Sequence, residues 1–221
     1  MTDANFHIET PRLYISYFQP ALDSHCDFLV RLYNTPEFIA TCGRSPITTR
    51  AIARDRLATR FVADHARNGY GIYLVSLKPS DPGADAAPAA GSDSEAPVQL
   101  PAFQDKLARC KLIGTVSLMR GSDAVAYAVP DLGFAVLPEE MRKGYAREAS
   151  AGLLDYVRRE KGVDVVLGLT DPKNEGAKGV FRSLGFEDRG VRKLAVFGNV
   201  DGAVWISPGA AEDLSVYNLN T

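Results

Sequence analysis

A glycine-centred loop with two basic residues is the part of this sequence best suited to bind an anion. It lies within DLGFAVLPEEMRKGYAREASAGLLDYVRR, residues 131–159, which predicts a short apolar strand, a turn, the loop and an amphipathic helix. Backbone N–H groups that open onto a helix N-terminus bind anions, because the unpaired donors and the helix dipole point to the same place. Gly144 lets a phosphate approach the backbone, and Arg142 and Lys143 add positive charge. The stretch therefore predicts a pyrophosphate-binding loop.

The cysteines and histidines predict neither a metal site nor a nucleophile. Cys26, Cys42 and Cys110 form no C-x-x-C pair, and the histidines are not at metal-ligand spacing. No histidine is placed in the sequence to activate a cysteine. An odd number of cysteines fits reduced thiols in the cytoplasm better than a disulfide framework. We therefore expect a cytoplasmic protein without a metal.

The composition is that of one globular domain. The 221 residues are 46% apolar and 24% charged, which is ordinary for a protein with a substantial core. A net charge of −2 provides no general basic field for nucleic acid. No apolar run approaches the roughly 18 residues needed to cross a bilayer, and the first residues show no secretory signal. We expect a single domain over residues 1–221, with neither nucleic acid nor a membrane as partner.

The chain before the loop predicts strands and helices interrupted by a low-complexity insertion. The expected elements are a strand within 8–18, a helix from about 23 that stops before Pro36, a helix over 48–69, and strands over 70–77 and 111–119. Residues 78–103, KPSDPGADAAPAAGSDSEAPVQLPAF, contain almost no large apolar side chain. Such a segment cannot bury enough surface to offset its ordering entropy, so we predict a flexible surface insertion, either without function or regulatory.

The chain after the loop predicts a helix, a strand, a short helix and a tail. Ala149, Leu153 and Val157 form an apolar stripe on a helix over 146–160, and the apolar run 163–170 predicts a buried strand. In the tail we predict strands over 192–197 and 214–219, separated by an irregular segment. Trp205 in that segment either anchors it to the sheet or lines a pocket. The element order indicates a mixed α/β (α+β) fold rather than a repeating βαβ ladder.

Four motifs, in a fixed order along the chain, carry a family resemblance. They are Thr10-Pro11-Arg12-Leu13, Leu132-Gly133-Phe134 followed by Pro138, Lys143-Gly144-Tyr145-Ala146-Arg147-Glu148-Ala149, and Asp171-Pro172-Lys173-Asn174 through Leu184-Gly185-Phe186. The set resembles the GNAT superfamily of N-acetyltransferases, and within it the ribosomal-protein alanine acetyltransferase branch. The corresponding patterns of that branch are T-x-R-L, a central strand, G-K-G-Y-A-x-E-A and D-x-x-N…L-G-F. The resemblance spans nearly the whole chain apart from the insertion and the irregular tail segment.

The resemblance implies a fold, a co-substrate and binding residues. The fold is a central, mostly antiparallel twisted sheet of about six to seven strands, flanked by about four helices, with a parallel pair splayed at the cofactor cleft. The donor is acetyl-CoA, and the acceptor is a primary amine of a protein N-terminus or a small molecule. The residues implied to bind the pantetheine arm are Phe134, Ala135 and Val136 through their backbone, with Asn174 and the helix carrying Phe181 on the other side. Those implied to hold the pyrophosphate are Arg142, Lys143, Gly144, Tyr145, Ala146 and Arg147.

The sequence departs from the family pattern at two positions. Met141 stands where the loop pattern has Gln or Arg, which matters little if backbone donors bind the pyrophosphate. Phe181 stands where some members have a tyrosine, and a phenylalanine has no proton to give the departing thiolate. Tyr217, Ser183 or water are the remaining candidates for that proton.

Asp131 is the candidate general base. It lies at the start of the central strand, where this branch often has an acidic residue; the alternative is an ordinary turn residue after Pro130. The leading interpretation is therefore an N-acetyltransferase. A catalytically weak CoA-binding regulatory module is the alternative that Phe181 favours. A nucleotide-binding domain is disfavoured, because no G-x-G-x-x-G or P-loop motif follows an early strand.

Overall fold

The fold is built on one mixed sheet. The computed structural model describes residues 3–79, 102–122 and 125–219. The strands are β1 (His7–Glu9), β2 (Leu13–Ser16), β3 (Ile72–Leu77), β4 (Lys111–Met119), β5 (Asp131–Val136), β6 (Leu167–Thr170), β7 (Glu187–Leu194) and β8 (Val200–Ile206). Within these residues they form an eight-stranded sheet in the order β1-β2-β3-β4-β5-β6-β8-β7. All neighbours are antiparallel except β5 and β6, which are parallel. The predicted fold class is confirmed, with one strand more than expected.

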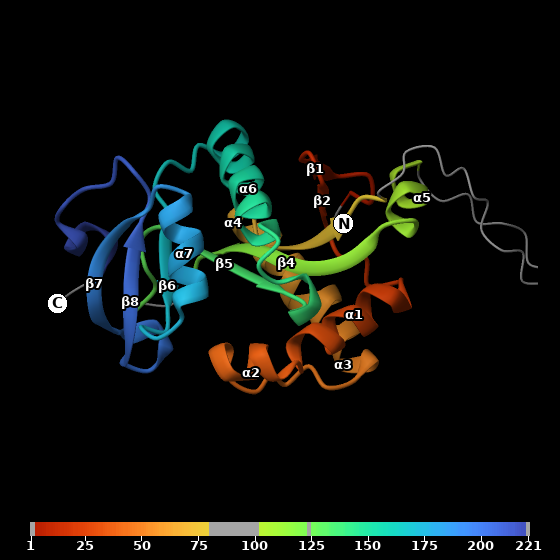
Figure 1. Ribbon diagram of the computed structural model, residues 1–221, viewed down its shortest axis with the longest axis horizontal. Helices are drawn as coiled ribbons and strands as arrows, with labels where there is room; N and C mark the ends of the chain where they lie inside the picture. The colour runs from red at the N-terminus through yellow and green to blue at the C-terminus, as the bar shows by residue number, and fades with distance from the viewer. Residues whose placement is uncertain (1–2, 80–101, 123–124, 220–221) are drawn as a thin grey trace, which may run out of the picture.

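Helices cover both faces of the sheet. They are α1 (Asp23–Tyr33), α2 (Pro36–Cys42), α3 (Arg50–Arg56), α4 (Val62–Asn68), α5 (Ala102–Ala108), α6 (Tyr145–Lys161) and α7 (Glu175–Ser183). A π-helical turn, Leu57–Phe61, joins α3 to α4, so the helix predicted over 48–69 is continuous. Figure 1 shows α6 and α7 on one face and α1 and α3 on the other. None of the helices in the described residues is long and apolar enough to cross a membrane.

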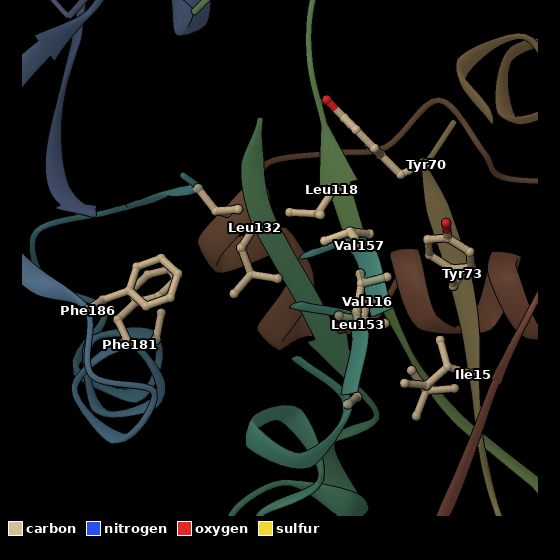
Figure 2. Packing of buried hydrophobic residues seen from close by; sticks show 14 of the residues in the cluster. Ile15, Tyr70, Tyr73, Val116, Leu118, Leu132, Leu153, Val157, Phe181 and Phe186 are labelled. Atoms are coloured by element: carbon tan, nitrogen blue, oxygen red, sulfur yellow. The ribbon is translucent and has the colours of Figure 1, made fainter. Parts of the chain in front are cut away.

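The largest core cluster lies between the sheet and the pair α6 and α7. Leu153 and Val157 of α6 pack toward Val116 and Leu132 of the central strands (Figure 2). These two helix residues are fully buried, as the apolar stripe in the sequence predicts. Burial of a side chain of this size stabilises the fold by about 1.5–3 kcal/mol. The packing fixes α6, and therefore the loop at its N-terminus, against the sheet.

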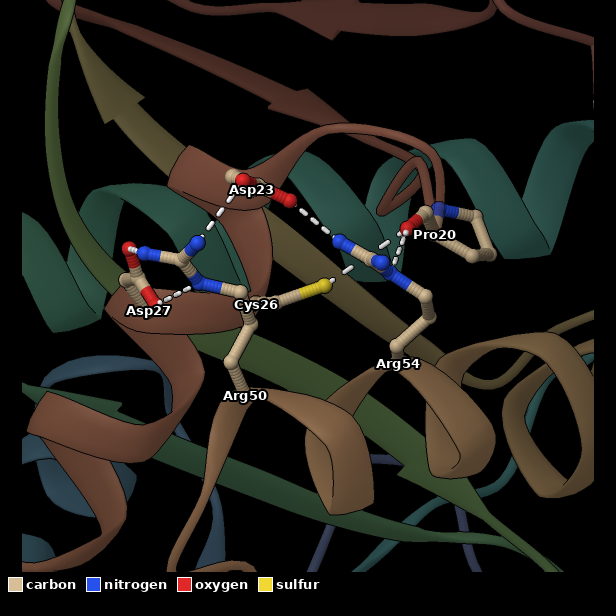
Figure 3. Close-up of polar contacts among 6 residues, drawn as sticks. All are labelled: Pro20, Asp23, Cys26, Asp27, Arg50 and Arg54. Carbon is tan, nitrogen blue, oxygen red and sulfur yellow. Dashed lines mark hydrogen bonds and ion pairs between the residues drawn. The ribbon is translucent and has the colours of Figure 1, made fainter.

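An ion-pair cluster joins α1 to α3 on the other face (Figure 3). Arg50 lies 2.6 Å from Asp27 and 2.8 Å from Asp23, and Arg54 pairs with Asp23 and donates to the Pro20 carbonyl at 3.2 Å. These charged side chains are about half exposed, so water and salt screen the pairs and each pair adds little to stability. The buried apolar residues beneath them carry most of the stability of this helix pair.

The N-terminal part contains two elements beyond those predicted. The strand predicted after the Thr-Pro entry is β2, and a further strand, β1, precedes it; Glu9 faces Tyr14, so Thr10-Pro11-Arg12 lies in the turn between these two antiparallel strands. Pro36 begins a helix as well as following one: it occupies the first turn of α2, where the Thr35 hydroxyl accepts a hydrogen bond from Phe38 N at 3.2 Å. A proline is tolerated there because the first N–H of a helix has no intrahelical partner.

The insertion predicted over 78–103 is shorter at both ends. Lys78 N donates to the Arg12 carbonyl at 2.9 Å, which continues the pairing of β3 with β2. Phe103 on α5 is buried and stacks on His7 with ring centroids 3.9 Å apart. The rest of the predicted insertion, residues 80–101, lies outside the described residues.

The tail differs from the prediction more than any other part. The segment predicted as irregular contains β8, which is hydrogen-bonded to β6 on one side and β7 on the other. Trp205 lies in this strand and is 2% exposed, so it belongs to the core of the sheet rather than to a loop. Of the strand predicted over 192–197, residues 192–194 are the end of β7, which starts at Glu187, and Ala195–Phe197 form a 3₁₀ turn. In place of the strand predicted over 214–219 there is another 3₁₀ turn, Leu214–Tyr217. Asp201-Gly202 and Pro208-Gly209 resemble turn signals and conceal β8 in the sequence.

Candidate functional site

The parallel strands β5 and β6 separate soon after they meet. Asp131 pairs with Leu167, and Leu167 N donates to the Pro130 carbonyl at 2.9 Å. Beyond this point β5 is paired only with β4, and β6 only with β8, among the described strands. The chain leaves both strands at their carboxyl ends, through loops to α6 and α7. A crevice at the carboxyl ends of diverging parallel strands is a common ligand position.

The loop from β5 to α6 has the backbone of an anion site. Gly144 has φ +83° and Arg142 has φ +61°, a left-handed conformation that non-glycine residues rarely adopt. The first N–H groups of any helix have no intrahelical partner. Gly144 is the N-cap of α6 and provides no side chain to accept from them, so these donors remain available to a ligand. Backbone donors next to left-handed residues form a concave anion-binding surface. The predicted loop thus has the required conformation, and its role in binding stays a prediction.

A buried carboxylate holds the Lys143 side chain. Glu140 is 4% exposed and lies 2.5 Å from the Lys111 ammonium and 2.9 Å from that of Lys143. Hydrogen bonds from Lys111 and then Lys143 lower the pKa of Glu140, and Glu140 raises the pKa of Lys143. Glu140 and Lys143 are therefore both charged at neutral pH. The sequence analysis did not identify Glu140, whose partner Lys111 lies 29 residues away in β4.

Phe181 belongs to α7, the helix that follows β6, and Asn174 is the N-cap of that helix. Asn174 Oδ1 accepts a hydrogen bond from Ala177 N at 3.0 Å and caps α7, so the oxygen of its side-chain amide is already engaged. Phe181 is 1% exposed and its ring lies 5.7 Å from that of Phe134 and 6.0 Å from that of Trp205. Phe181 therefore fills the space between α7 and the separating strands. Contact of Asn174 and Phe181 with a pantetheine arm stays a prediction.

Gly168 of β6 is required by the close approach of Phe181. A Cβ at Gly168 would lie 2.5 Å from the Phe181 ring. That ring cannot retreat, because Trp205 packs on it, so we expect Gly168→Ala to lower the unfolding free energy by about 1–3 kcal/mol in thermal or urea unfolding. The matched control is Gly179→Ala on α7, where a Cβ meets nothing within 4 Å. Equal stability of the two variants would contradict this packing.

Asp131 lies at the end of β5 away from the loop. Its pairing with Leu167 places its side chain on the face that also carries Tyr127, opposite α6 and α7. Asp131 is partly buried, and burial raises the pKa of its carboxyl to about 7, with its own backbone N–H opposing. Such a group exchanges a proton readily at neutral pH, as a general base requires.

A nearby tyrosine was missed in the sequence. Tyr127 is 5% exposed; burial, and then the negative charge of Asp131, raise the pKa of its hydroxyl. The hydroxyl is therefore protonated at neutral pH. The sequence signal was weak, because Tyr127 lies in a connecting segment without a pattern.

The other two proton-donor candidates are engaged elsewhere. The Tyr217 hydroxyl accepts a hydrogen bond from Ala211 N at 2.8 Å within the tail. The Ser183 hydroxyl donates to the Val180 carbonyl at 2.7 Å, and its own carbonyl accepts from Arg147 at 3.3 Å. Arg147 belongs to the first turn of α6, so Ser183 lies near the N-terminus of α6, away from Asp131.

The histidines have structural roles. His25 is buried, its Nδ1 accepts from Gln19 N at 3.0 Å, and burial lowers its pKa to about 4. His65 Nε2 lies 3.0 Å from the Ile72 carbonyl. In the described part of the chain no three His, Cys, Asp or Glu side chains are grouped as metal ligands.

Comparison with known proteins identifies the family. A family model described as an acetyltransferase (GNAT) domain matches residues 12–187, which is most of the chain. No curated protein matches in a sequence comparison. The structure is similar to that of the ribosomal-protein-S5-alanine acetyltransferase of Vibrio fischeri, with a TM-score of 0.65 and 17% identity over 95% of this chain and 98% of that one.

Two further structures share the fold. The GNAT-family acetyltransferase of Bacillus anthracis has a TM-score of 0.61 and 16% identity, over 91% of this chain and 97% of that one. The microcin C7 self-immunity acetyltransferase, solved with acetyl-CoA and AMP, has a TM-score of 0.63 and 12% identity, over 90% and 93%. At these identities the likeness concerns the fold, while the family match rests on the sequence. The chain therefore belongs to the GNAT family of acetyltransferases.

Proposed function

We propose that this protein transfers an acetyl group from acetyl-CoA to a primary amine of a protein N-terminus or a small molecule. The observation that supports this most is the separation of β5 from β6 after a single pair, together with the uncapped loop with left-handed residues that follows β5. A structural neighbour has been solved with acetyl-CoA. The cysteines Cys26, Cys42 and Cys110 are free thiols, which supports a cytoplasmic location.

The unpaired edge of β5 and the loop after it fit a CoA-type ligand. The edge of β5 over Phe134, Ala135 and Val136 faces β6 without being paired to it, so its backbone groups can bind an extended amide arm as a further strand would. The N–H groups of residues 142–147 would hold the pyrophosphate. β5 spans about 17 Å between the loop and Asp131, so an arm lying along it carries the thioester toward the acidic residue.

Asp131 would act as the general base. The acceptor arrives as an ammonium ion, and Asp131 takes its proton so that the nitrogen lone pair can attack the thioester carbon. The new C–N bond forms as the C–S bond breaks, and CoA leaves as a thiolate. Phe181 cannot protonate the thiolate, so a proton comes from water or from Tyr127. The nitrogen of the new C–N bond still carries one proton too many, and the loss of that proton restores the donor and leaves a neutral amide. Acceptors would approach on the face of the sheet that carries Asp131. On this face one core cluster lies under α1 and α3 and another lies under the C-terminal tail, and the acceptor would arrive between them.

The pH profile should follow Asp131. Its carboxyl is protonated below pH about 7 and cannot accept a proton, so kcat/KM should rise as the pH increases through about 7 and then level off. The measurement is initial rates of CoA release from pH 5.5 to 9 at amine concentrations below KM, with an amine that stays protonated over this range. Asp131→Asn should remove this inflection. An inflection that persists in the variant would assign it to another group.

The function is tested by turnover of acetyl-CoA with a panel of small amines and peptides, with detection of free thiol. Release of thiol above background with one acceptor class, together with a product heavier by one acetyl group, supports the proposal. Tight CoA binding with no acceptor that releases thiol would favour a CoA-binding regulatory module, the alternative that Phe181 suggests. Preferential binding of ATP or NAD over CoA would contradict both.

A further inference from the structure

We propose that Thr10, Arg12 and Glu148 form a clamp that positions the loop 141–145 for pyrophosphate binding. The inference rests on the proposed function only in naming the ligand; the clamp itself is a property of the free protein. Arg12 is a positioning residue in this proposal, because it acts through the loop rather than on the reacting atoms.

The centre of the clamp is the Glu148 carboxylate. It accepts hydrogen bonds from Thr10 Oγ1 at 2.7 Å, from Arg12 N at 2.8 Å and from Arg12 Nε at 2.6 Å. Burial alone would raise the pKa of Glu148, but the bonds from Thr10 and Arg12 outweigh it and hold the pKa below its usual value. Glu148 is therefore ionised at neutral pH and joins the first turn of α6 to the turn between β1 and β2.

Arg12 extends this contact to the loop. Its Nη1 donates to the Lys143 carbonyl at 3.0 Å, and its guanidinium lies 4.6 Å from the centre of the Tyr145 ring. One planar side chain therefore contacts a carboxylate, a loop carbonyl and an aromatic ring, which a lysine cannot do. The approach of α6 is close here: a Cβ at Gly152 would lie 2.8 Å from Thr10.

The Lys143 carbonyl is the bond that matters for the ligand. In a planar trans peptide the C=O and the next N–H point in opposite directions, so binding of the carbonyl by Arg12 directs the Gly144 N–H away from Arg12. Lys143 stands between Arg142 and Gly144, both of which have positive φ. A strained loop of this kind persists only where its surroundings hold it. Two residues supply those contacts: Arg12 binds the Lys143 carbonyl, and Glu140 accepts a hydrogen bond from the Lys143 ammonium.

A simpler explanation is that the positive charge of Arg12 attracts the anion. The direction in which CoA affinity changes when Glu148 is removed separates this explanation from the clamp. Glu148 is a negative charge at the edge of the loop, so its removal should strengthen anion binding if charge alone matters. If the clamp matters, its removal should weaken binding, because Arg12 loses its anchor. Arg12→Lys separates the two explanations in a second way, since lysine keeps the positive charge but lacks the planar set of N–H donors of the guanidinium.

The test compares Glu148→Ala and Arg12→Lys with the wild type, and with Arg159→Ala as control. Arg159 is an exposed residue of α6 that pairs with Asp155, near the other end of the helix. We expect both clamp variants to raise the Kd for CoA in calorimetry about tenfold, and the control to leave it unchanged. S-acetylpantetheine, which lacks the pyrophosphate, should keep its kcat/KM in all three variants.

Tighter or unchanged CoA binding by Glu148→Ala would overturn the clamp, as would an equal loss with S-acetylpantetheine. Amide hydrogen exchange of the free protein gives a reading that needs no ligand. The amides of Met141 and Glu148 flank the loop and donate to the Pro138 and Gly144 carbonyls, so both should lose protection in the clamp variants and not in the control. Unchanged exchange there would also overturn the proposal. If the wild type fails to bind CoA, the proposed function fails, and the exchange result still decides whether the clamp holds the loop.

Discussion

Asp131→Asn is expected to lower kcat with acetyl-CoA and its best amine acceptor by about 10²- to 10⁴-fold, while the Kd for CoA stays within about twofold. The amide has nearly the shape of the carboxylate but cannot take the proton from the acceptor ammonium ion. The binding loop lies at the other end of β5, so CoA affinity should be unaffected. The measurement is steady-state thiol release at pH 8, with CoA binding followed by calorimetry.

The same substitution should raise stability at pH 8. The pKa of Asp131 is about 7 in the folded protein, against 3.8 for an ordinary aspartate. The folded state therefore binds the proton more tightly than the unfolded state, and the free energy of unfolding falls as the pH rises from about 4 to about 7. Asparagine removes this cost, so the thermal midpoint of Asp131→Asn should exceed that of the wild type at pH 8 and not at pH 4.

Asp201→Asn is the matched control, since Asp201 is an exposed aspartate whose partner is Lys193. It should leave kcat unchanged. Full activity of Asp131→Asn would show that Asp131 is a turn residue without a catalytic role. Loss of activity together with lower stability at pH 8 would indicate damage to the fold instead.

Gly144→Val is expected to weaken CoA binding about 10- to 100-fold. Gly144 has φ +83°, which a β-branched residue avoids, so the loop must change conformation or remain strained. Either outcome displaces the N–H groups that would hold the pyrophosphate. The measurement is the Kd for CoA, together with the kcat for S-acetylpantetheine, which should be little affected.

Gly162→Val separates strain from binding. Gly162 ends the same helix with φ +63°, and a Cβ there meets nothing within 4 Å. Both variants should therefore lose comparable stability in urea unfolding, of the order of 1–2 kcal/mol. Only Gly144→Val should lose CoA affinity. Equal loss of CoA affinity in both variants would mean that strain anywhere in α6 weakens binding, and that the conformation of the loop at Gly144 is not what binds CoA.

Local patterns in the sequence predicted the central part of the fold. β4 has the predicted bounds, and the stripe of Leu153 and Val157 faces the core as expected. Those signals are strong because each depends on neighbours within two turns or one strand. β8 escaped prediction because its stability comes from β6 and β7, on which it is hydrogen-bonded at both edges, and not from a local pattern.

The same limit applies to the candidate site. The loop could be predicted, since Gly144, its basic neighbours and the following helix are contiguous. The contacts that hold it could not, because they join residues far apart: Glu148 and Arg12 are separated by 136 positions. The T-x-R-L motif contributed to the family resemblance without indicating what Arg12 contacts. The raised pKa of Asp131 likewise depends on burial, which the order of residues around it does not reveal.

A crystal structure of the protein with CoA would test the central claim most directly. The account predicts pyrophosphate oxygens within hydrogen-bonding distance of backbone N atoms of residues 142–147. It also predicts the pantetheine arm along Phe134, Ala135 and Val136, with the sulfur directed toward the Asp131 end of β5. CoA bound elsewhere, or in the crevice with its pyrophosphate away from the loop, would contradict it.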